Sequence, residues 1–338
     1  MNHSNIWVSK CLEAKAFKNI HPFLVSLLLF GFPQLILVFV IQKIVGKISL
    51  ISIRSFYSLS LVLIWIALGP YLIWIYDKKL LPSFFKKIEE IFGENETAKK
   101  LNIKYNNMFA KKYYYFCLIW AIFFIIGFFF AEDYFLSIEI KSYSVVHYLI
   151  LINVIWVGIF AGIGFFGVFV TLKAVYETSK KFTVLNPFHQ DGVGGLSRFG
   201  SLAIGTTLLF ATGSLFIPVI IDVISSVSNN TFIFYVLGAL YVLAIALSFL
   251  VPIYIVNKRA SRIKNNYLRK IGEELLNLIG KNSEELLYQF KILNLRSLYF
   301  DYKNVKLYPI ELDTTLKLIF SLLLPIIIIL FEHYVFKI

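Results

Sequence analysis

Six long stretches of this sequence contain no lysine, arginine, aspartate or glutamate. They are residues 19–42, 55–76, 113–131, 142–172, 199–221 and 223–257. The hydrocarbon core of a bilayer is about 30 Å thick, and an α-helix needs about 20 apolar residues to cross it. Each stretch meets or approaches that length, so each is predicted to contain a membrane-spanning helix.

A seventh stretch without charge, residues 318–331, is shorter. Lys317 can lie at one membrane interface, and Glu332, His333 and Tyr334 can lie at the other, because long or amphipathic side chains reach from a helix end to the headgroups. We therefore expect a full span here too. The predicted fold class is all-α: a polytopic α-helical membrane bundle of about seven transmembrane helices. The composition, 58% hydrophobic and 16% charged, agrees with this prediction.

The distribution of positive charge predicts the orientation of the chain. With the N-terminus in the cytosol, 28 of the 33 lysines and arginines fall in the inner segments, which are residues 1–21, 77–112, 173–199 and 257–317. Loops rich in Lys and Arg stay on the cytoplasmic side during insertion, so we predict a cytoplasmic membrane location with a cytosolic N-terminus. The formal net charge of +13 is then entirely cytosolic. Attraction to the anionic lipids of the inner leaflet explains it, and no nucleic-acid partner is predicted.

Two of the cytosolic segments are long enough to fold outside the membrane. Residues 77–112 and 257–317 each contain an apolar helical pattern interrupted by a glycine, which is typical of a helical hairpin. In the second segment Gly280 is a suitable helix C-terminus, and Ser283 followed by two glutamates is a suitable start for the next helix. We expect both hairpins to be insertions into one membrane domain, residues 1–338.

Proline interrupts most of the predicted spans. Five prolines fall inside five different spans, namely Pro33, Pro70, Pro218, Pro252 and Pro325. Each proline removes a backbone hydrogen bond that a neighbouring helix, a hydroxyl or water must replace. Broken helices of this kind surround the binding cavities of transporters and channels. Ordinary tight packing of a helical bundle is the alternative interpretation.

Glycine and polar side chains in the spans give two further expectations. Gly158 and Gly162 form a Gly-x-x-x-Gly pair, which predicts a close approach of another helix. The polar side chains expected at membrane depth include His147, Asn153 and Thr206, but no carboxylate and no ammonium group. Proton pumps and voltage sensors depend on charges within the membrane, so this pattern argues against both.

The turn between the fourth and fifth predicted spans concentrates residues suited to binding. Residues 186–198 read Asn-Pro-Phe-His-Gln-Asp-Gly-Val-Gly-Gly-Leu-Ser-Arg. The glycines permit positive φ, at which successive backbone N–H groups can converge on an anion. The positive end of the following helix and an arginine side chain would strengthen that attraction. The turn therefore predicts a site for an anionic or phosphate-bearing ligand, formed by His189, Asp191, Gly192, Gly194, Gly195 and Arg198. The alternative is a tight turn in which Asp191 caps the helix.

The same turn resembles a motif of the form Pro-x-His-Pro-Asp-Gly-x-Gly-Gly-Leu, which lies between two transmembrane helices in an uncharacterised family of prokaryotic multi-pass membrane proteins. The similarity runs from Pro187 to Leu196, with Gln190 where the family usually has its second proline. A looser similarity lies between Pro309 and Pro325, where an aspartate precedes the final helix. The family has no assigned activity, so the resemblance implies a helical membrane architecture and no particular chemistry.

Three functions are compatible with these features. The leading hypothesis is a non-enzymatic, ligand- or partner-responsive protein that acts as a channel-like effector or a transporter. The second is an enzyme that acts on a lipid or another membrane-held substrate at the inner leaflet through His189 and Asp191. The third is a structural subunit of a membrane complex, and a homo-oligomer is a further candidate assembly. Cys11 and Cys117 are far apart in the sequence, so we predict neither a disulfide nor a metal site, and the cofactor is left open.

Overall fold

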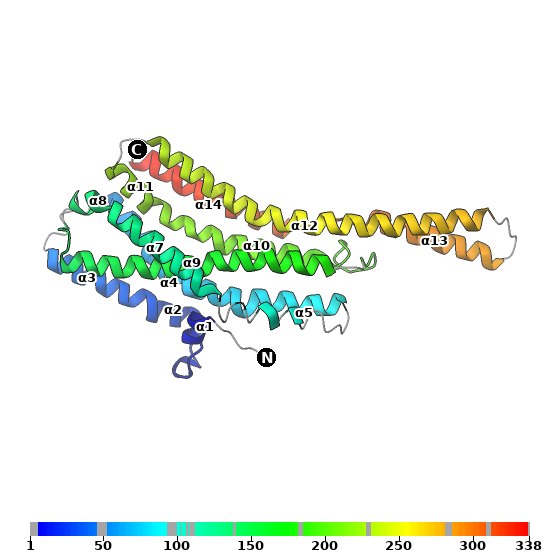
Figure 1. Cartoon of the computed structure of the whole chain (residues 1–338), viewed down its shortest axis with the longest axis horizontal. Helices are drawn as coiled ribbons and strands as arrows, with labels where there is room; N and C mark the ends of the chain where they lie inside the picture. Colours follow the sequence, from blue (N-terminus) through cyan, green and yellow to red (C-terminus); the bar gives the residue numbers. More distant parts are fainter. Residues whose placement is uncertain are drawn as a thin grey trace.

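The chain folds into a bundle of long α-helices in the computed structural model (Figure 1). The structure describes residues 6–45, 53–92, 100–101, 103–105, 108, 112–137, 140–181, 185–227, 231–280, 286–308 and 312–336. Within those residues every regular element is helical and no strand is present, which confirms the all-α prediction.

The helices follow one another with short connections. In the N-terminal half they are α1 (Trp7–Leu12), η1 (Lys15–Phe17), α2 (Pro22–Ser26), η2 (Leu27–Gly31), α3 (Phe32–Val45), α4 (Ile53–Ile75), η4 (Tyr76–Leu80), α5 (Leu81–Phe92), α7 (Tyr113–Phe130) and α8 (Glu132–Ser137). In the C-terminal half they are α9 (Val145–Lys181), α10 (Ser197–Ala211), η5 (Thr212–Phe216), α11 (Ile217–Val227), α12 (Thr231–Ile279), α13 (Leu286–Asn304) and α14 (Leu312–Phe336).

Five helical segments are long and apolar enough to cross a membrane, so the chain is a helical membrane protein. They are Tyr57–Ile88, Tyr113–Phe130, Val145–Lys181, Ser197–Val223 and Val236–Ile279, and Pro22–Leu37 and Thr315–Phe331 are shorter apolar helices. Together they coincide with the seven predicted stretches. The side chains on the outside of the bundle are apolar as well, as on α7, where Leu118 and Phe123 are exposed. A surface of this kind is stable against lipid and would be unstable in water.

Close backbone contact joins α7 to α9. A Cβ atom added to Gly158 would lie 2.8 Å from Ala121 Cα, and one added to Gly162 would lie 2.6 Å from Cys117 Cα. Real Cβ atoms do not approach backbone atoms so closely, so the two helices can pack at this distance only because both positions are glycine. The predicted Gly-x-x-x-Gly contact is confirmed.

Three of the helices contain an irregular turn that ends two residues before a proline. The π-helical turn η2 ends at Gly31 and precedes Pro33, and the π-helical turn η4 precedes Pro82 in the same way. The 3₁₀ turn η5 ends at Phe216 and precedes Pro218. Because proline cannot donate a backbone hydrogen bond and its ring crowds the preceding turn, the helix changes its winding just before it. Pro70, Pro252 and Pro325 lie within regular helices.

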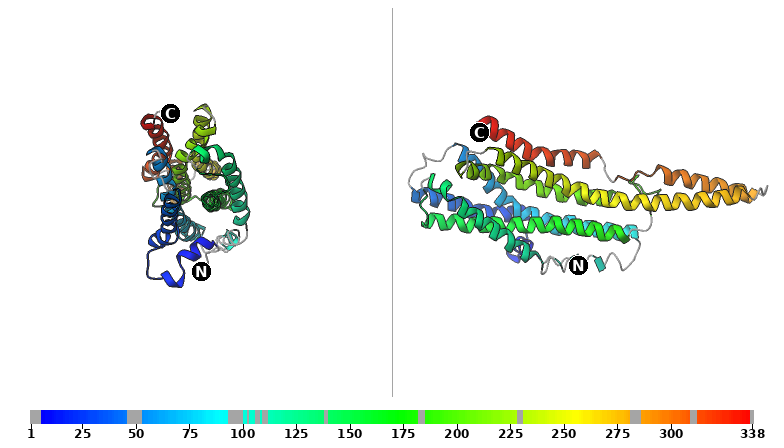
Figure 2. Two further views of the ribbon diagram at one scale, coloured as in Figure 1. Left: turned by 90° about the vertical axis from the view of Figure 1, so that its left-hand side faces the viewer. Right: turned by 45° about the horizontal axis from the view of Figure 1, so that its top comes forward.

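A helical hairpin extends well beyond the bundle. Helix α12 has 49 residues, which corresponds to about 74 Å at 1.5 Å per residue. It therefore continues the sixth span without a break, and the first helix of the predicted hairpin over residues 257–317 is its far end. The helix ends at Gly280 as predicted, whereas the predicted start at Ser283 lies outside the described residues. Helix α13 packs back along α12, and both project from one end of the molecule (Figures 1 and 2).

Candidate functional site

The turn between α9 and α10 has the backbone conformation that its glycines predict. Gly192, Gly194 and Gly195 have φ angles of +63°, +69° and +92°. Residues with a Cβ atom are strained at positive φ, so the backbone conformation favours glycine at all three positions. Space is a further constraint at Gly194, where an added Cβ atom would lie 2.7 Å from Leu185 Cδ1.

The backbone N–H groups of this turn converge on an anion, and the anion is the side chain of Asp191. Oδ1 accepts hydrogen bonds from the N–H groups of Val193 and Gly195, both at 3.0 Å, and Oδ2 accepts one from Ser197 at 3.2 Å. Ser197 is the first residue of α10, so the carboxylate also satisfies one of the free N–H groups at the start of that helix. Asp191 thus caps the helix from a position within the turn.

The hydrogen bonds to Asp191 stabilise its charged form. Burial alone would raise the pKa of Asp191, but the backbone N–H groups of Gly195, Ser197 and Val193 outweigh burial and hold the pKa below its usual range. The carboxylate is therefore ionised at neutral pH, and it neutralises the partial positive charge of the helix end.

His189 lies against the same carboxylate. Its Nδ1 atom accepts a hydrogen bond from the Asp191 backbone N–H group at 3.3 Å and lies 2.9 Å from Asp191 Oδ1. A neutral imidazole that accepts at Nδ1 carries its proton on Nε2. The side chain of His189 is 31% exposed. Only Nε2 is then available to a ligand.

The structure brings most of the predicted site residues together around Asp191. His189 and Asp191 are in contact, and Gly194 and Gly195 shape the turn around the carboxylate. Arg198 is half-buried, and the described residues provide no hydrogen bond or ion pair to its guanidinium group. An external anion that used the same N–H groups would have to displace Asp191. The geometry is that of the helix-capping alternative, and anion binding at this turn stays a prediction.

The turn also rests on the base of the α12–α13 hairpin. Leu185, Val193 and Leu196 are buried in the main core together with Val305, which follows α13. A Cβ atom on Gly194 would lie 3.3 Å from Val305 Cγ1. The ammonium group of Lys264 on α12 donates hydrogen bonds to the carbonyl groups of Lys303 and Val305, at 2.7 and 2.9 Å. A movement of the hairpin would therefore reach α10 through this turn.

Buried hydroxyl groups connect α10 to its neighbours inside the bundle. Tyr76 Oη lies 2.9 Å from Thr171 Oγ1, which lies 3.0 Å from Thr206 Oγ1. On the next residue of α10, Thr207 Oγ1 lies 3.0 Å from Ser248 Oγ. These contacts join η4, α9, α10 and α12. Sequence reasoning identified Thr206 but missed Tyr76, because a tyrosine at the end of an apolar stretch is typical of the membrane interface.

The irregular turn η5 interrupts the helix that α10 and α11 would otherwise form. Tyr241 of α12 donates a hydrogen bond from its hydroxyl group to the Phe210 carbonyl group at 2.7 Å. The same hydroxyl oxygen would lie 2.6 Å from a Cβ atom on Gly213, so this approach requires glycine. Ser214 is fully buried, and its Oγ atom has no hydrogen-bond partner in the part of the chain that the structure describes. The irregular turn therefore contains buried polar groups, and the hydroxyl group of Tyr241 packs against it.

Two carboxylates at the edges of the charge-free stretches are buried. Asp77 is 9% exposed and Asp222 is 5% exposed. Both lie in helical segments that are long and apolar enough to cross a membrane. They were missed because each lies at the edge of a charge-free stretch, where the sequence pattern assigns it to an interface. Their burial depends on which helices pack around them, and the pattern does not contain that information.

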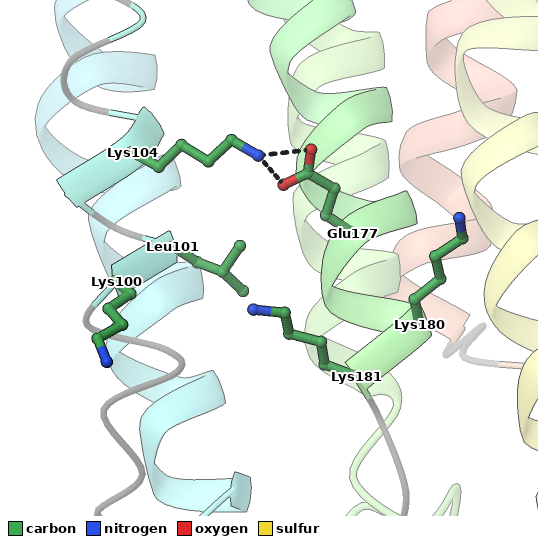
Figure 3. Close-up of a pocket in the computed structure, with 6 residues that line it drawn as sticks. All are labelled: Lys100, Leu101, Lys104, Glu177, Lys180 and Lys181. Carbon is green, nitrogen blue, oxygen red and sulfur yellow. Dashed lines mark hydrogen bonds and ion pairs between the residues drawn. The ribbon is translucent and has the colours of Figure 1, made fainter.

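A small pocket lies at the end of α9. It has a volume of about 250 Å³ and is lined by Lys100, Leu101, Lys104, Glu177, Lys180 and Lys181. Lys104 reaches across it to both carboxylate oxygens of Glu177, at 2.8 and 2.7 Å (Figure 3). Lys181 points toward Leu101, whereas Lys180 points away. Because Lys104 already neutralises Glu177, the pocket has no clear binding group beyond its remaining lysines.

Comparisons with protein-family models, with curated proteins and with solved structures found no match.

Proposed function

We propose that this chain is a membrane transport protein, a channel-like effector or a transporter that responds to a ligand or a partner. The observation that supports this best is the polar break at η5, inside a helix of the bundle. Irregular backbone within a membrane is tolerated only where protein or a water-filled cavity satisfies it. Transporters bind and release substrates at such breaks. Here the Tyr241 hydroxyl group donates a hydrogen bond to the Phe210 carbonyl group, which also accepts a hydrogen bond from a backbone N–H group at the end of α10, so Tyr241 joins α12 to the irregular turn.

The response to a ligand or partner is proposed to start at the turn and the hairpin. Val305 at the hairpin base and Gly194 in the turn are in the same packed region, and Asp191 ties the turn to the start of α10. Helix α10 leads directly into η5. A change at either outer element is thereby transmitted to the break through one continuous set of contacts. The resemblance of residues 187–196 to the family with the Pro-x-His-Pro-Asp-Gly motif is part of this proposal.

A flux measurement on proteoliposomes tests the transport function. The full-length protein should pass ions or a small dye faster than empty liposomes do. Tyr241→Phe should change the flux severalfold, because it removes the hydroxyl group that joins α12 to the irregular turn. Tyr254→Phe is the matched control, since Tyr254 lies on the same helix and is 63% exposed on the outside of the bundle. Turnover of the liposome lipid without flux would contradict the proposal and support the enzyme alternative through His189 and Asp191.

A second measurement tests the turn as the ligand site. Pyrophosphate should raise the melting temperature of the wild-type protein, and Arg198→Gln should abolish the rise. Asp191→Asn should strengthen pyrophosphate binding, because the carboxylate that occupies the N–H groups loses its charge. Arg269→Gln, at an exposed arginine of the hairpin, is the control. An equal response of all four proteins would remove the anion site and leave Asp191 as a helix cap.

A further inference from the structure

Helix α13 is apolar on two opposite faces. One face packs on α12, where Tyr302 stacks on Tyr267 with ring centroids 5.0 Å apart. The opposite face carries four exposed apolar side chains: Leu286 (73%), Phe290 (58%), Leu293 (60%) and Phe300 (46%). Ser297 fills the remaining place, so the stripe repeats at alternating intervals of four and three residues. That is the heptad repeat of a helix that pairs with another helix.

The stripe lies outside the membrane. Helix α12 is about 74 Å long, which exceeds the roughly 30 Å of a hydrocarbon core by more than half its length. Helix α13 runs alongside the far part of α12, away from the bundle (Figure 2). It therefore stands along the direction of the spans, and does not lie flat as an interfacial helix would. An apolar stripe in water is unfavourable unless another surface covers it.

The size of the stripe is suited to a helix–helix interface. The four apolar side chains expose on the order of 500 Å² per copy, and with the flanking polar residues this approaches the roughly 800 Å² per partner of a standard interface. A membrane-binding helix is rich in lysine and arginine beside its apolar face. Here the flanking residues include only one arginine and one lysine, with two amides and an acidic residue: Arg296, Lys303, Gln289, Asn294 and Asp301. A protein surface fits this face better than an anionic lipid surface does.

The polar residues beside the stripe match a second copy of the same helix. With Phe290 and Leu293 at the core positions a and d of a heptad, Arg296 takes position g and Asp301 takes position e of the next heptad. In a parallel pair of helices, position g of one chain lies opposite that position e of the other. Neither Arg296 nor Asp301 has an ion-pair partner among the described residues. Gln289 and Asn294 are related by the same spacing and form a second complementary pair.

We propose that two copies of this chain associate through α13, as a parallel and symmetric pair of helices in which Arg296 of each copy faces Asp301 of the other. Two molecules in one membrane that are related by a two-fold axis along the membrane normal project their hairpins from the same side. Their α13 helices are then parallel, as the charge pattern requires. This association does not depend on the transport function.

Disulfide cross-linking of the full-length protein in liposomes tests the contact. In a variant with Cys11→Ser and Cys117→Ala, Leu293→Cys should form a disulfide-linked dimer under mild oxidation. Leu276→Cys should not, although Leu276 of α12 is equally apolar and 72% exposed on the same hairpin. Leu293→Glu should weaken dimerisation by about tenfold or more, as measured from the mass distribution in nanodiscs. A monomeric wild-type protein, or equal cross-linking at both positions, would overturn the proposal.

A charge exchange tests the orientation. Arg296→Glu places two acidic groups opposite each other and should weaken the dimer, whereas the double variant Arg296→Glu with Asp301→Arg should restore it. Both variants keep the apolar stripe and change only residues that are not buried, so a weaker dimer reports the change of charge and not a loss of folding. If the dimer of the double variant is no more stable than the dimer of Arg296→Glu alone, the parallel pairing is wrong.

Discussion

The charge of Asp191 stabilises the backbone of the turn before α10. Its carboxylate accepts hydrogen bonds from three backbone N–H groups, one of them at the start of α10. Asp191→Asn keeps the shape but loses the charge and one acceptor, so it should lower the free energy of unfolding by about 1–2 kcal/mol, as loss of a helix cap does. Thermal unfolding in detergent at pH 7 measures this. Glu273→Gln, at an exposed position on α12, should change the melting temperature little.

The same side chain predicts a pH dependence. The pKa of Asp191 is lower in the folded protein than in the unfolded chain, where it is about 3.9. A lowered folded pKa gives stability that is present above the unfolded pKa and is lost as pH falls through the folded pKa. The difference in melting temperature between wild type and Asp191→Asn should therefore be constant from pH 7 to 5 and shrink below about pH 4. A difference that grew on acidification would contradict this assignment.

Gly162 and Gly164 provide a matched pair of substitutions on one helix. A Cβ atom on Gly162 would lie 2.6 Å from the Cα atom of Cys117, whereas one on Gly164 would meet nothing within 4 Å. Gly162→Ala should therefore destabilise the protein by about 1–3 kcal/mol through overpacking. Gly164→Ala should be neutral or slightly stabilising, because alanine favours a helix over glycine. Equal effects in a thermal unfolding assay would show that α7 and α9 do not pack through this face.

Single positions of the turn were predictable where one residue type has one conformational role. Positive φ at Gly192, Gly194 and Gly195 follows from glycine itself, and the structure confirms it. The occupant of the converging N–H groups was not predictable in the same way. Asp191 and an external phosphate offer the same kind of oxygen atom, and only the fold of the turn shows that the side chain reaches them.

At the level of the helices, the prolines predicted that the spans are interrupted but did not predict the form of the interruption. Pro33 and Pro82 follow π-helical turns and Pro218 follows a 3₁₀ turn, while Pro70 lies in regular helix. The winding depends on the side chains that pack around each turn. At η5 the hydroxyl group of Tyr241, from a helix that is distant in the sequence, donates a hydrogen bond to the Phe210 carbonyl group. The hairpin is a second example. Gly280 predicts the end of α12 from the local sequence, but no local feature predicts that this helix is continuous with the sixth span.

The hydroxyl contacts between helices can be measured at Thr171. Its Oγ1 atom contacts Tyr76 on one side and Thr206 on the other. Thr171→Val keeps the shape and removes both contacts, so it should cost about 1 kcal/mol, since one hydrogen bond between membrane helices contributes about 0.6 kcal/mol on average and about 1.7 kcal/mol at most. Thr212→Val is the control, because the Thr212 hydroxyl group in η5 donates its hydrogen bond to the nearby Leu209 carbonyl group and not to another span. A larger loss at Thr212 in detergent unfolding would show that the contacts at Thr171 do not stabilise the bundle.

For the whole molecule, the sequence predicted the number of apolar helices and their positions along the chain. It did not predict which helices pack against one another. Every span is apolar around most of its circumference, so periodicity does not mark the buried face, as it does in a soluble helix. The structure shows that α10 packs against α9, α12 and α14. Nothing in its sequence alone distinguishes it from α7, whose outer side chains face away from the bundle.

The arrangement of the two ends agrees with the charge pattern and allows a test of orientation. Helix α5, the turn before α10 and the α12–α13 hairpin lie toward one end of the molecule, and α8 and the start of α12 lie toward the other (Figures 1 and 2). The first end contains most of the lysines and arginines, so we expect it in the cytosol. Without the native cysteines, Tyr143→Cys should react with an impermeant maleimide in intact cells. Phe188→Cys and Leu287→Cys should react only after permeabilisation, although all three positions are at least 70% exposed. The reverse pattern would invert the orientation, and a difference between Phe188 and Leu287 would show that the turn and the hairpin are not on the same side.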